Sequence, residues 1–482
     1  MWKYAEPKAI ATLAGKAITS ALLIALVAGC KVGPNYARPA VNTPQAYRGA
    51  LAPELTSNAG PSVADQDWRT IFTDPVLQHL VDQALQNNLD LRIAAQRILE
   101  AQAQVGVVRS QQLPTVGAGG SFSALQIPAG LANKNADGSA NDFLRGGGFS
   151  ASAAWNLDFW GLYRRQTEAA RAELLATEWA QRATRVSLIE ELATAYFRLR
   201  SLDSELEITH NTIKAREDSL RLTQSLETYG AGSRADTRQA EELLHTAQAN
   251  LPEIRRQIAL EENAISILLG RVPDGITRGL SIEEQPHPLT VPAGLPSELL
   301  EQRPDIRQAE AELIAANARI GVAKAQFFPQ ISLTSLGGSA SNQLQSIFDG
   351  KNAYWYAAGS LSQPIFAGGR ISSNYKYSKA QEQEMVARYQ KSILNALKDV
   401  SNSLVTYNES ENRRREQREV VVSATDAVRL ARLRYAGGNT SYLEVLTTDT
   451  DLYDAQLKLT QAQSLQAASL VQLYTALGGG WK

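Results

Sequence analysis

The sequence holds few of the residues that build metal centres and disulfides. Among its 482 residues are one cysteine, two methionines and four histidines. One cysteine cannot form a disulfide within the chain, and so few possible ligands leave little material for a metal site. No constellation of residues typical of an enzyme is present either. We therefore expect a protein that is not an enzyme and that binds no metal and no dissociable cofactor.

The sequence also lacks an excess of charge of either sign. Its 48 basic side chains are balanced by 49 acidic ones. Proteins that bind nucleic acid normally carry a basic excess, so we expect no nucleic-acid partner. After residue 30 there is no apolar run of about 18 residues, the length that marks a transmembrane helix. We therefore expect no such helix in the mature chain.

The one cysteine, Cys30, ends an N-terminal targeting segment. Three lysines precede an apolar stretch at residues 17–28, which is typical of a secretory signal. Small residues directly before Cys30 look like a lipobox, where the signal is cleaved and the cysteine is acylated. We predict a signal peptide at residues 1–29 and a covalent lipid on Cys30, and Lys31 after it favours the outer membrane. The alternative is an ordinary signal peptide with an incidental cysteine.

Residues 30–74 are predicted as an extended, lipid-anchored tether. Five prolines exclude a long helix here, namely Pro34, Pro39, Pro44, Pro53 and Pro61. A helix start is expected at Asp74-Pro75, because proline is favoured in the first helical turn. Helical pattern then continues to about residue 110.

Residues 372–435 are predicted to form one very long helix. Apolar residues recur seven apart, with Arg414 the one break, at Val386, Ile393, Val400, Tyr407, Val421, Val428 and Tyr435. This narrow stripe is a coiled-coil seam, and the helix would be roughly 95 Å long. The alternative is several shorter helices broken by kinks. A second helical run completes a helical hairpin at residues 372–477.

An earlier helical hairpin is predicted at residues 163–269. Its first helix carries a similar seam at Leu192, Leu199, Leu206, Ile213 and Leu220. Its second helix contains Pro252, which should kink it.

Two stretches, at residues 115–124 and 149–159, alternate between apolar and polar or small residues, which is the signal of a β-strand, and the matching part of the second half of the chain predicts two more. They predict β-hairpins at residues 115–159 and 331–365. The order of helix, β-hairpin and helical hairpin occurs twice, which indicates an internal duplication. The matched residues include Tyr229 with Tyr435, Gly232 with Gly438, and Gly270 with Gly478. We predict a first repeat at residues 75–270, a proline-rich linker at 271–297 and a second repeat at 298–482.

Strands of about ten residues suit a tilted membrane crossing. An open sheet edge is not tolerated in lipid, and four strands are too few to close a barrel. Two or three chains must then combine. The predicted fold class is a mixed α+β membrane protein, whose four β-strands per chain contribute to an outer-membrane β-barrel continued by a long periplasmic α-helical coiled-coil barrel. The alternative is a soluble four-stranded sheet.

Several motifs resemble one family across essentially the whole mature chain. They are Cys30-Lys31-Val32-Gly33-Pro34-Asn35-Tyr36, Asp67-Trp68, Asn88-Leu89-Asp90-Leu91, Trp155-Asn156-Leu157-Asp158, Arg303-Pro304-Asp305-Ile306 and Pro364-Ile365-Phe366-Ala367-Gly368-Gly369-Arg370. Together they resemble the TolC-like outer-membrane efflux family, and its NodT-type lipoproteins in particular.

The resemblance implies a homotrimer with a barrel of about twelve strands. It implies the exit duct of a tripartite efflux pump for drugs or other toxic small molecules, which performs no chemistry itself. An inner-membrane transporter of the resistance–nodulation–division type and a periplasmic adaptor protein would be its partners. A type I protein-secretion duct, a metal-ion efflux duct and a lipid-anchored coiled-coil protein without a pore remain alternatives.

The resemblance also implies functional residues at the tips of the helical hairpins. The adaptor would contact Tyr229, Gly230, Gly232, Tyr435, Gly437 and Gly438. Relatives carry acidic rings that narrow the pore, and these map to Glu444 and to Thr447, where the expected acid is missing. Asp451 lies seven residues after Glu444 on the same helix face, whereas Asp449 does not. Candidate residues for a latch between the tips are Arg234, Asp236, Arg238 and Thr440, although relatives can carry a basic residue in place of Thr440.

Overall fold

The computed structural model describes residues 31–41, 44, 47–48, 63–126, 128, 143–286 and 296–481. These residues form two compact units. The first, here called the strand unit, contains residues up to 39 together with 98–176 and 310–388. The second, the hairpin unit, contains residues 40–97, 177–309 and 389–482. Each unit draws on both halves of the sequence, so neither half is a separate compact body.

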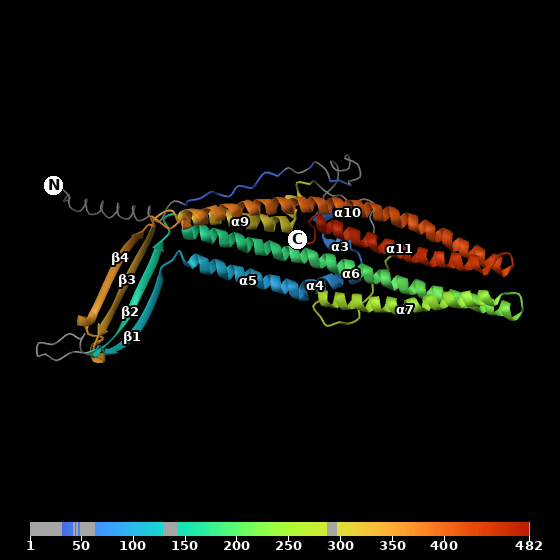
Figure 1. The fold of residues 1–482 in the computed structure, drawn as a ribbon, viewed down its shortest axis with the longest axis horizontal. Coiled ribbons are helices and arrows are strands. Elements are labelled where there is room, and N and C mark those ends of the chain that lie inside the picture. Colours follow the sequence, from blue (N-terminus) through green and yellow to red (C-terminus); the bar gives the residue numbers. More distant parts are fainter. Residues whose placement is uncertain are drawn as a thin grey trace, which may run out of the picture. The chain divides into compact units, whose positions relative to one another are not determined.

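A four-stranded antiparallel sheet lies in the strand unit (Figure 1). Its strands are β1 (Thr115–Gln126), β2 (Phe143–Leu157), β3 (Gln330–Ser341) and β4 (Ala353–Ser362), paired in that order. The prediction of four strands is confirmed. β2 begins before the predicted alternation because Gly146, Gly147 and Gly148 give no period-two signal. Backbone pairing places Gly147 between Phe122 and Ser341 all the same.

Both edge strands of this sheet expose their side chains within the single chain. Every residue of β1 and β4 is exposed, including large apolar ones such as Val116, Phe122 and Trp355. The β3–β4 connection contains two short 3-10 helices, η2 (Leu344–Ser346) and η3 (Gly350–Asn352). The sheet therefore presents apolar surface and two edges that the described residues do not cover.

Two helices of 67 residues run without a break, α6 (Leu162–Thr228) and α10 (Arg370–Ala436). The prediction that residues 372–435 form one helix is thus confirmed, and the alternative of several shorter helices broken by kinks is wrong. Its seam is buried at Ile393, Val400 and Tyr407. Shorter helices are α5 (Leu89–Ser110) and α9 (Pro304–Ala325). No helix among the described residues is long and apolar enough to span a membrane.

The hairpin unit contains α7 (Arg234–Leu268) and α11 (Tyr442–Ala476), each of 35 residues. Pro252 lies inside α7, which continues past it to Leu268. The unit also holds η1 (Val63–Asp65), α3 (Trp68–Ile71), α4 (Pro75–Asn87) and α8 (Leu299–Gln302). The predicted helix start is confirmed, since Asp74 caps α4 by accepting hydrogen bonds from the Val76 and Leu77 amides.

The four helices of the two helical hairpins all end in the same way. Each is followed by a glycine at positive φ, at Gly230, Gly270, Gly438 and Gly478. After each of these glycines the next residue's amide donates back to a carbonyl five residues earlier, for example Asn439 to Arg434 at 2.8 Å. This is a Schellman ending, which glycine adopts without steric cost. The conformational equivalent of Gly438 is therefore Gly230, and the predicted match with Gly232 is wrong.

Candidate gate at the helical hairpin tips

The hairpin tips are the turns after α6 and α10. The predicted contact residues divide between two environments. On the first tip, Tyr229 is 85% exposed, and Gly230 next to it is exposed too. On the second tip, Gly437 and Gly438 are exposed. Tyr435, by contrast, is buried, and Gly232 is half-buried. The first tip thus offers an aromatic side chain to solvent, whereas Tyr435, which lies three residues before Gly438 at the second tip, belongs to a core.

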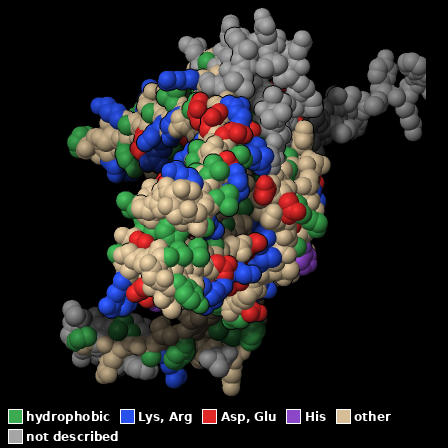
Figure 2. All heavy atoms as spheres, turned by 90° about the vertical axis from the view of Figure 1, so that its right-hand side faces the viewer, with side chains coloured by type: hydrophobic (Ala, Val, Ile, Leu, Met, Phe, Trp, Pro, Cys, Tyr) green, Lys and Arg blue, Asp and Glu red, His purple; other side chains and the backbone are tan. Residues whose placement is uncertain are grey.

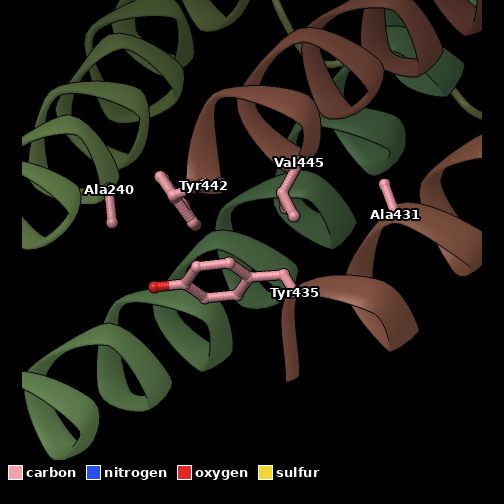
Figure 3. Packing of buried hydrophobic residues seen from close by; sticks show 5 residues of the cluster. All are labelled: Ala240, Ala431, Tyr435, Tyr442 and Val445. Carbon is pink, nitrogen blue, oxygen red and sulfur yellow. The ribbon is translucent and has the colours of Figure 1, made fainter. Parts of the chain in front are cut away.

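That core joins the two hairpins. It consists of Ala240 from α7, Ala431 and Tyr435 from α10, and Tyr442 and Val445 from α11 (Figure 3). The rings of Tyr435 and Tyr442 meet at a centroid distance of 5.2 Å and an interplanar angle of 64°. Such edge-to-face pairs add stability beyond the area that they bury.

Tyr435 also makes a polar contact across the two hairpins. Its hydroxyl points from α10 towards the other hairpin (Figure 3) and donates to Asp236 of α7 at 3.4 Å. Burial, reinforced by the charge of Asp236, raises the pKa of Tyr435 to about 12. The hydroxyl therefore stays neutral at physiological pH and can remain a donor.

A buried ionic cluster lies further along the hairpins from their tips. Asp449 of α11 accepts from Arg216 Nε of α6 and from Arg432 Nη2 of α10, both at 2.8 Å. The side chains of Arg216 and Asp449 are only 4% and 8% exposed. Arg216 also donates to the Leu243 carbonyl of α7 at 2.8 Å. One carboxylate and two guanidinium groups therefore connect all four helices of the two hairpins.

This cluster was not predicted from the sequence, where Asp449 was compared only with the helix face of Glu444. Asp449 lies four residues after Val445 and four before Tyr453, so it falls within a buried row of α11. An acid in such a row needs a charged partner, because burying an unpaired charge is very unfavourable. That spacing is the signal that could have identified it.

The predicted gate acid Glu444 is already engaged within its own hairpin. It accepts from Arg434 Nη1 at 2.7 Å and from the Thr440 hydroxyl. Thr447 is exposed, and its hydroxyl donates to the Leu443 carbonyl. Asp451 is exposed and lines a groove between α10 and α11 together with Glu416 and Glu419. A single chain therefore leaves Thr447 and Asp451 facing outward and holds Glu444 partly covered.

The four predicted latch residues do not act as a set. Asp236 bonds across the hairpins to Tyr435. Arg238 forms an ion pair with Glu241 on its own helix. The Thr440 hydroxyl donates a hydrogen bond to Glu444 within its own hairpin, and Arg234 is exposed. The structure thus brings one of the four into contact with the opposite tip in the part of the chain that it describes.

Cys30, the predicted lipid site, lies outside the described residues.

Figure 2 views the side of the molecule on which the hairpin tips lie in Figure 1. Lys and Arg side chains are interspersed there with Asp and Glu, and hydrophobic side chains lie between them. A mixture of both charge signs with apolar groups between them is ordinary for a protein surface.

A family model described as outer membrane efflux protein matches residues 80–271 and 295–479. The chain belongs to the outer membrane efflux protein family. The predicted family and the outer-membrane location are confirmed.

Similar proteins align along nearly their whole length. The probable efflux pump outer membrane protein TtgC of Pseudomonas putida is 35% identical, over 95% of this chain and 94% of its own. The solvent efflux pump outer membrane protein SrpC of the same species is 36% identical, over 95% and 96%. The cation efflux system protein CusC of Escherichia coli is 33% identical, over 94% and 96%.

Solved structures of similar proteins share the fold. The open state of the Neisseria gonorrhoeae MtrE outer membrane channel superposes with a TM-score of 0.84 at 30% identity, covering 94% of this chain and 99% of that one. The Campylobacter jejuni CmeC outer membrane channel gives 0.85 at 25% identity, covering 94% and 95%. The predicted α+β fold is thereby confirmed as that of outer-membrane efflux channels.

Proposed function

We propose that this protein is the passive exit duct of a tripartite efflux pump and that it works as a homotrimer. The observation that carries the proposal is the exposed sheet, whose edge strands β1 and β4 each pair with one strand only among the described residues. Open edges are not tolerated in lipid. Pairing β4 of one copy with β1 of the next would close a barrel of about twelve strands from three copies, wide enough for a water-filled channel.

The duct itself would perform no chemistry. The energy would come from an inner-membrane transporter of the resistance–nodulation–division type, joined to the duct by a periplasmic adaptor. The hairpin tips support this arrangement, because the exposed Tyr229 and the neighbouring Gly230 allow a partner to approach the backbone closely. In this proposal Glu444, Asp451 and Thr447 face the pore at the tip end, and the Tyr435–Asp236 contact holds the tips together.

Organic toxic compounds are the proposed cargo, since relatives at 35–36% identity are named for toluene, solvent and antibiotic efflux. A metal cation is the second candidate, because the CusC relative is named a cation efflux protein. The deciding experiment is a susceptibility panel on a deletion strain, with solvents, unrelated antibiotics and a series of metal salts. Sensitivity to many organic compounds supports the first cargo, and sensitivity to the metal salts alone supports the second. Loss of one secreted protein with no change in susceptibility would contradict both.

We further propose that Cys30 carries the lipid anchor. The support is its position directly after a signal-like segment and small residues. Cells grown with radioactive palmitate should label the wild-type protein and not Cys30→Ser. Equal labelling of both proteins would contradict the assignment.

A further inference from the structure

The described chain begins with an extended segment, residues 31–38, here called the strap. It has no regular secondary structure, yet it is not a free tether. The Val32 amide donates to the Trp160 carbonyl at 3.2 Å, just beyond the end of β2. The Asn317 side chain of α9 donates to the Pro34 carbonyl at 3.3 Å. The strap therefore binds to the strand unit through specific backbone contacts.

Arg165 of α6 is the centre of this binding. Its side chain is completely buried. Its guanidinium donates to the Val32 carbonyl at 3.1 Å, the Gly33 carbonyl at 3.2 Å and Asn35 Oδ1 at 3.1 Å. Its remaining contact is an ion pair with Glu168 at 3.0 Å, and Glu168 also pairs with Lys31. A planar guanidinium suits several acceptors at once, which a lysine ammonium cannot match.

The strap also fits sterically at one point. Gly33 has φ of 103°, and a Cβ there would lie 2.5 Å from the Cα of Gly321 on α9. A Cβ at Gly321 would in turn meet the aliphatic part of Arg165 at 2.8 Å. Two glycines thus allow strap, α9 and the arginine stem to stack in direct contact.

A second ionic contact fixes the far end of the strap. Arg38 forms a two-pronged pair with the buried Glu310 of α9, at 2.6 and 2.7 Å, and the Tyr36 hydroxyl donates to the same carboxylate at 3.2 Å. Two-pronged arginine–carboxylate pairs are among the stronger and more directional ion pairs. The strap is thus held at both ends by a buried charged side chain, Arg165 at one end and Glu310 at the other.

The near end of the strap lies beside an aromatic cluster of Phe159, Trp160 and Phe328. Trp160 stacks on Phe328 at 4.7 Å and meets Phe159 edge-on at 4.9 Å, and its indole donates to the Pro329 carbonyl. This cluster lies between the end of β2 at Leu157 and the start of β3 at Gln330. Aromatic residues at strand ends are typical of the membrane–water interface.

We propose that Arg165 is a positioning residue that binds the strap and thereby holds the lipid-bearing end of the chain at the aromatic cluster. Cys30 precedes Val32 by two residues, a reach of about 7 Å. The acyl chains would then enter the membrane next to the strand ends. This proposal rests on acylation of Cys30, although binding of the strap by Arg165 can be tested separately from it.

Hydrogen–deuterium exchange of the full-length protein in detergent tests the strap contact. Arg165→Met should speed exchange of the strap amides by about tenfold or more, while amides of β1–β4 keep their protection. Arg165→Lys should give an intermediate rate. Arg171→Met is the matched control, because Arg171 lies on the same helix and is exposed. In this variant the strap amides should exchange at the wild-type rate. Unchanged strap exchange in Arg165→Met, or equal loss of protection in the strands, would overturn the proposal.

A charge exchange keeps the test decisive if Arg165→Met does not fold. Arg38→Glu should release the strap, and adding Glu310→Arg should restore its protection. Failure of the double variant to restore protection would count against a strap held by these pairs.

The position of the lipid requires its own readout. A palmitate analogue with a photoreactive group near its carboxyl end should cross-link to residues 159–161 and 328–330 in the wild type. In Arg165→Met these cross-links should be lost although the analogue is still attached. Attachment without cross-links in the wild type would overturn the positioning proposal. No attachment at all would overturn acylation of Cys30, and with it the lipid part of this proposal.

Discussion

At the scale of single residues, Asp449 is a side chain with a large expected effect on stability, because it is buried and pairs with two arginines. A buried ion pair adds little net stability compared with an apolar pair, but removing one partner leaves a charge uncompensated. Asp449→Asn leaves Arg216 buried without its anion and should lower the free energy of unfolding by about 3 kcal/mol. Thermal unfolding followed by circular dichroism would measure the loss.

Asp426→Asn is the matched control for this change. Asp426 pairs with Arg429 on the same helix, and both side chains are about 60% exposed. An exposed pair of this kind contributes at most about 1 kcal/mol. Equal effects of the two substitutions would mean that the cluster does not hold the hairpins together.

Tyr435 makes the tip contact sensitive to alkaline pH. Its pKa rises from the ordinary 10.0 to about 12 because the neutral hydroxyl is buried beside Asp236. The resulting stabilisation is complete below pH 10 and is lost as pH rises towards 12, since the unfolded state ionises first. The absorbance of ionised tyrosine is measured against pH for the wild type and for Tyr435→Phe. The difference between the two curves should show one group titrating near pH 12. A difference curve centred near pH 10 would contradict the buried contact.

At the scale of elements, the hairpins depend on how their long helices end. Gly438 has φ of 72° and open space around it, so an added Cβ meets no atom but strains the backbone. Gly438→Ala should therefore destabilise the tip by about 1 kcal/mol, visible as faster local hydrogen exchange at residues 435–441. Gly437→Ala is the control, because its φ is not positive, and its Cβ would come tightly only against the end of the Asn439 side chain at 3.2 Å, with the Leu433 carbonyl at an ordinary 3.5 Å. A larger effect at Gly437 would contradict the Schellman ending.

At the scale of the whole molecule, the roles of the sheet edges and of the tip charges depend on the proposed trimer. Three copies of Glu444 around one axis would concentrate negative potential and attract cations. Glu444→Ala should then raise leak conductance and weaken cation block in planar bilayers. It would also remove the acceptor of Arg434, so Arg434→Gln serves as a control for that lost pair. Equal changes in both variants would assign the effect to the hairpin contact rather than to a ring.

Much of the fold could be predicted from the sequence because its signals are local. Heptad spacing predicted α10, strict alternation predicted β1, and Asp74-Pro75 predicted the start of α4, each from neighbouring residues. The start of β2 was missed because glycines carry no alternating side chain, and pairing with Phe122 and Ser341 defines that segment. The equivalence of Gly230 with Gly438 was missed because only backbone dihedral angles distinguish it from Gly232.

By itself, the sequence determined the element types, their repeated order and the family, because periodicity and motif order are properties of the chain alone. The tertiary structure decided which partners the charged side chains contact. Arg216 and Asp449 are 233 residues apart in sequence, and Arg165 and Val32 are 133 apart. No local pattern connects such pairs. Their attraction becomes strong only where packing removes water from both partners, and that burial is a property of the folded chain.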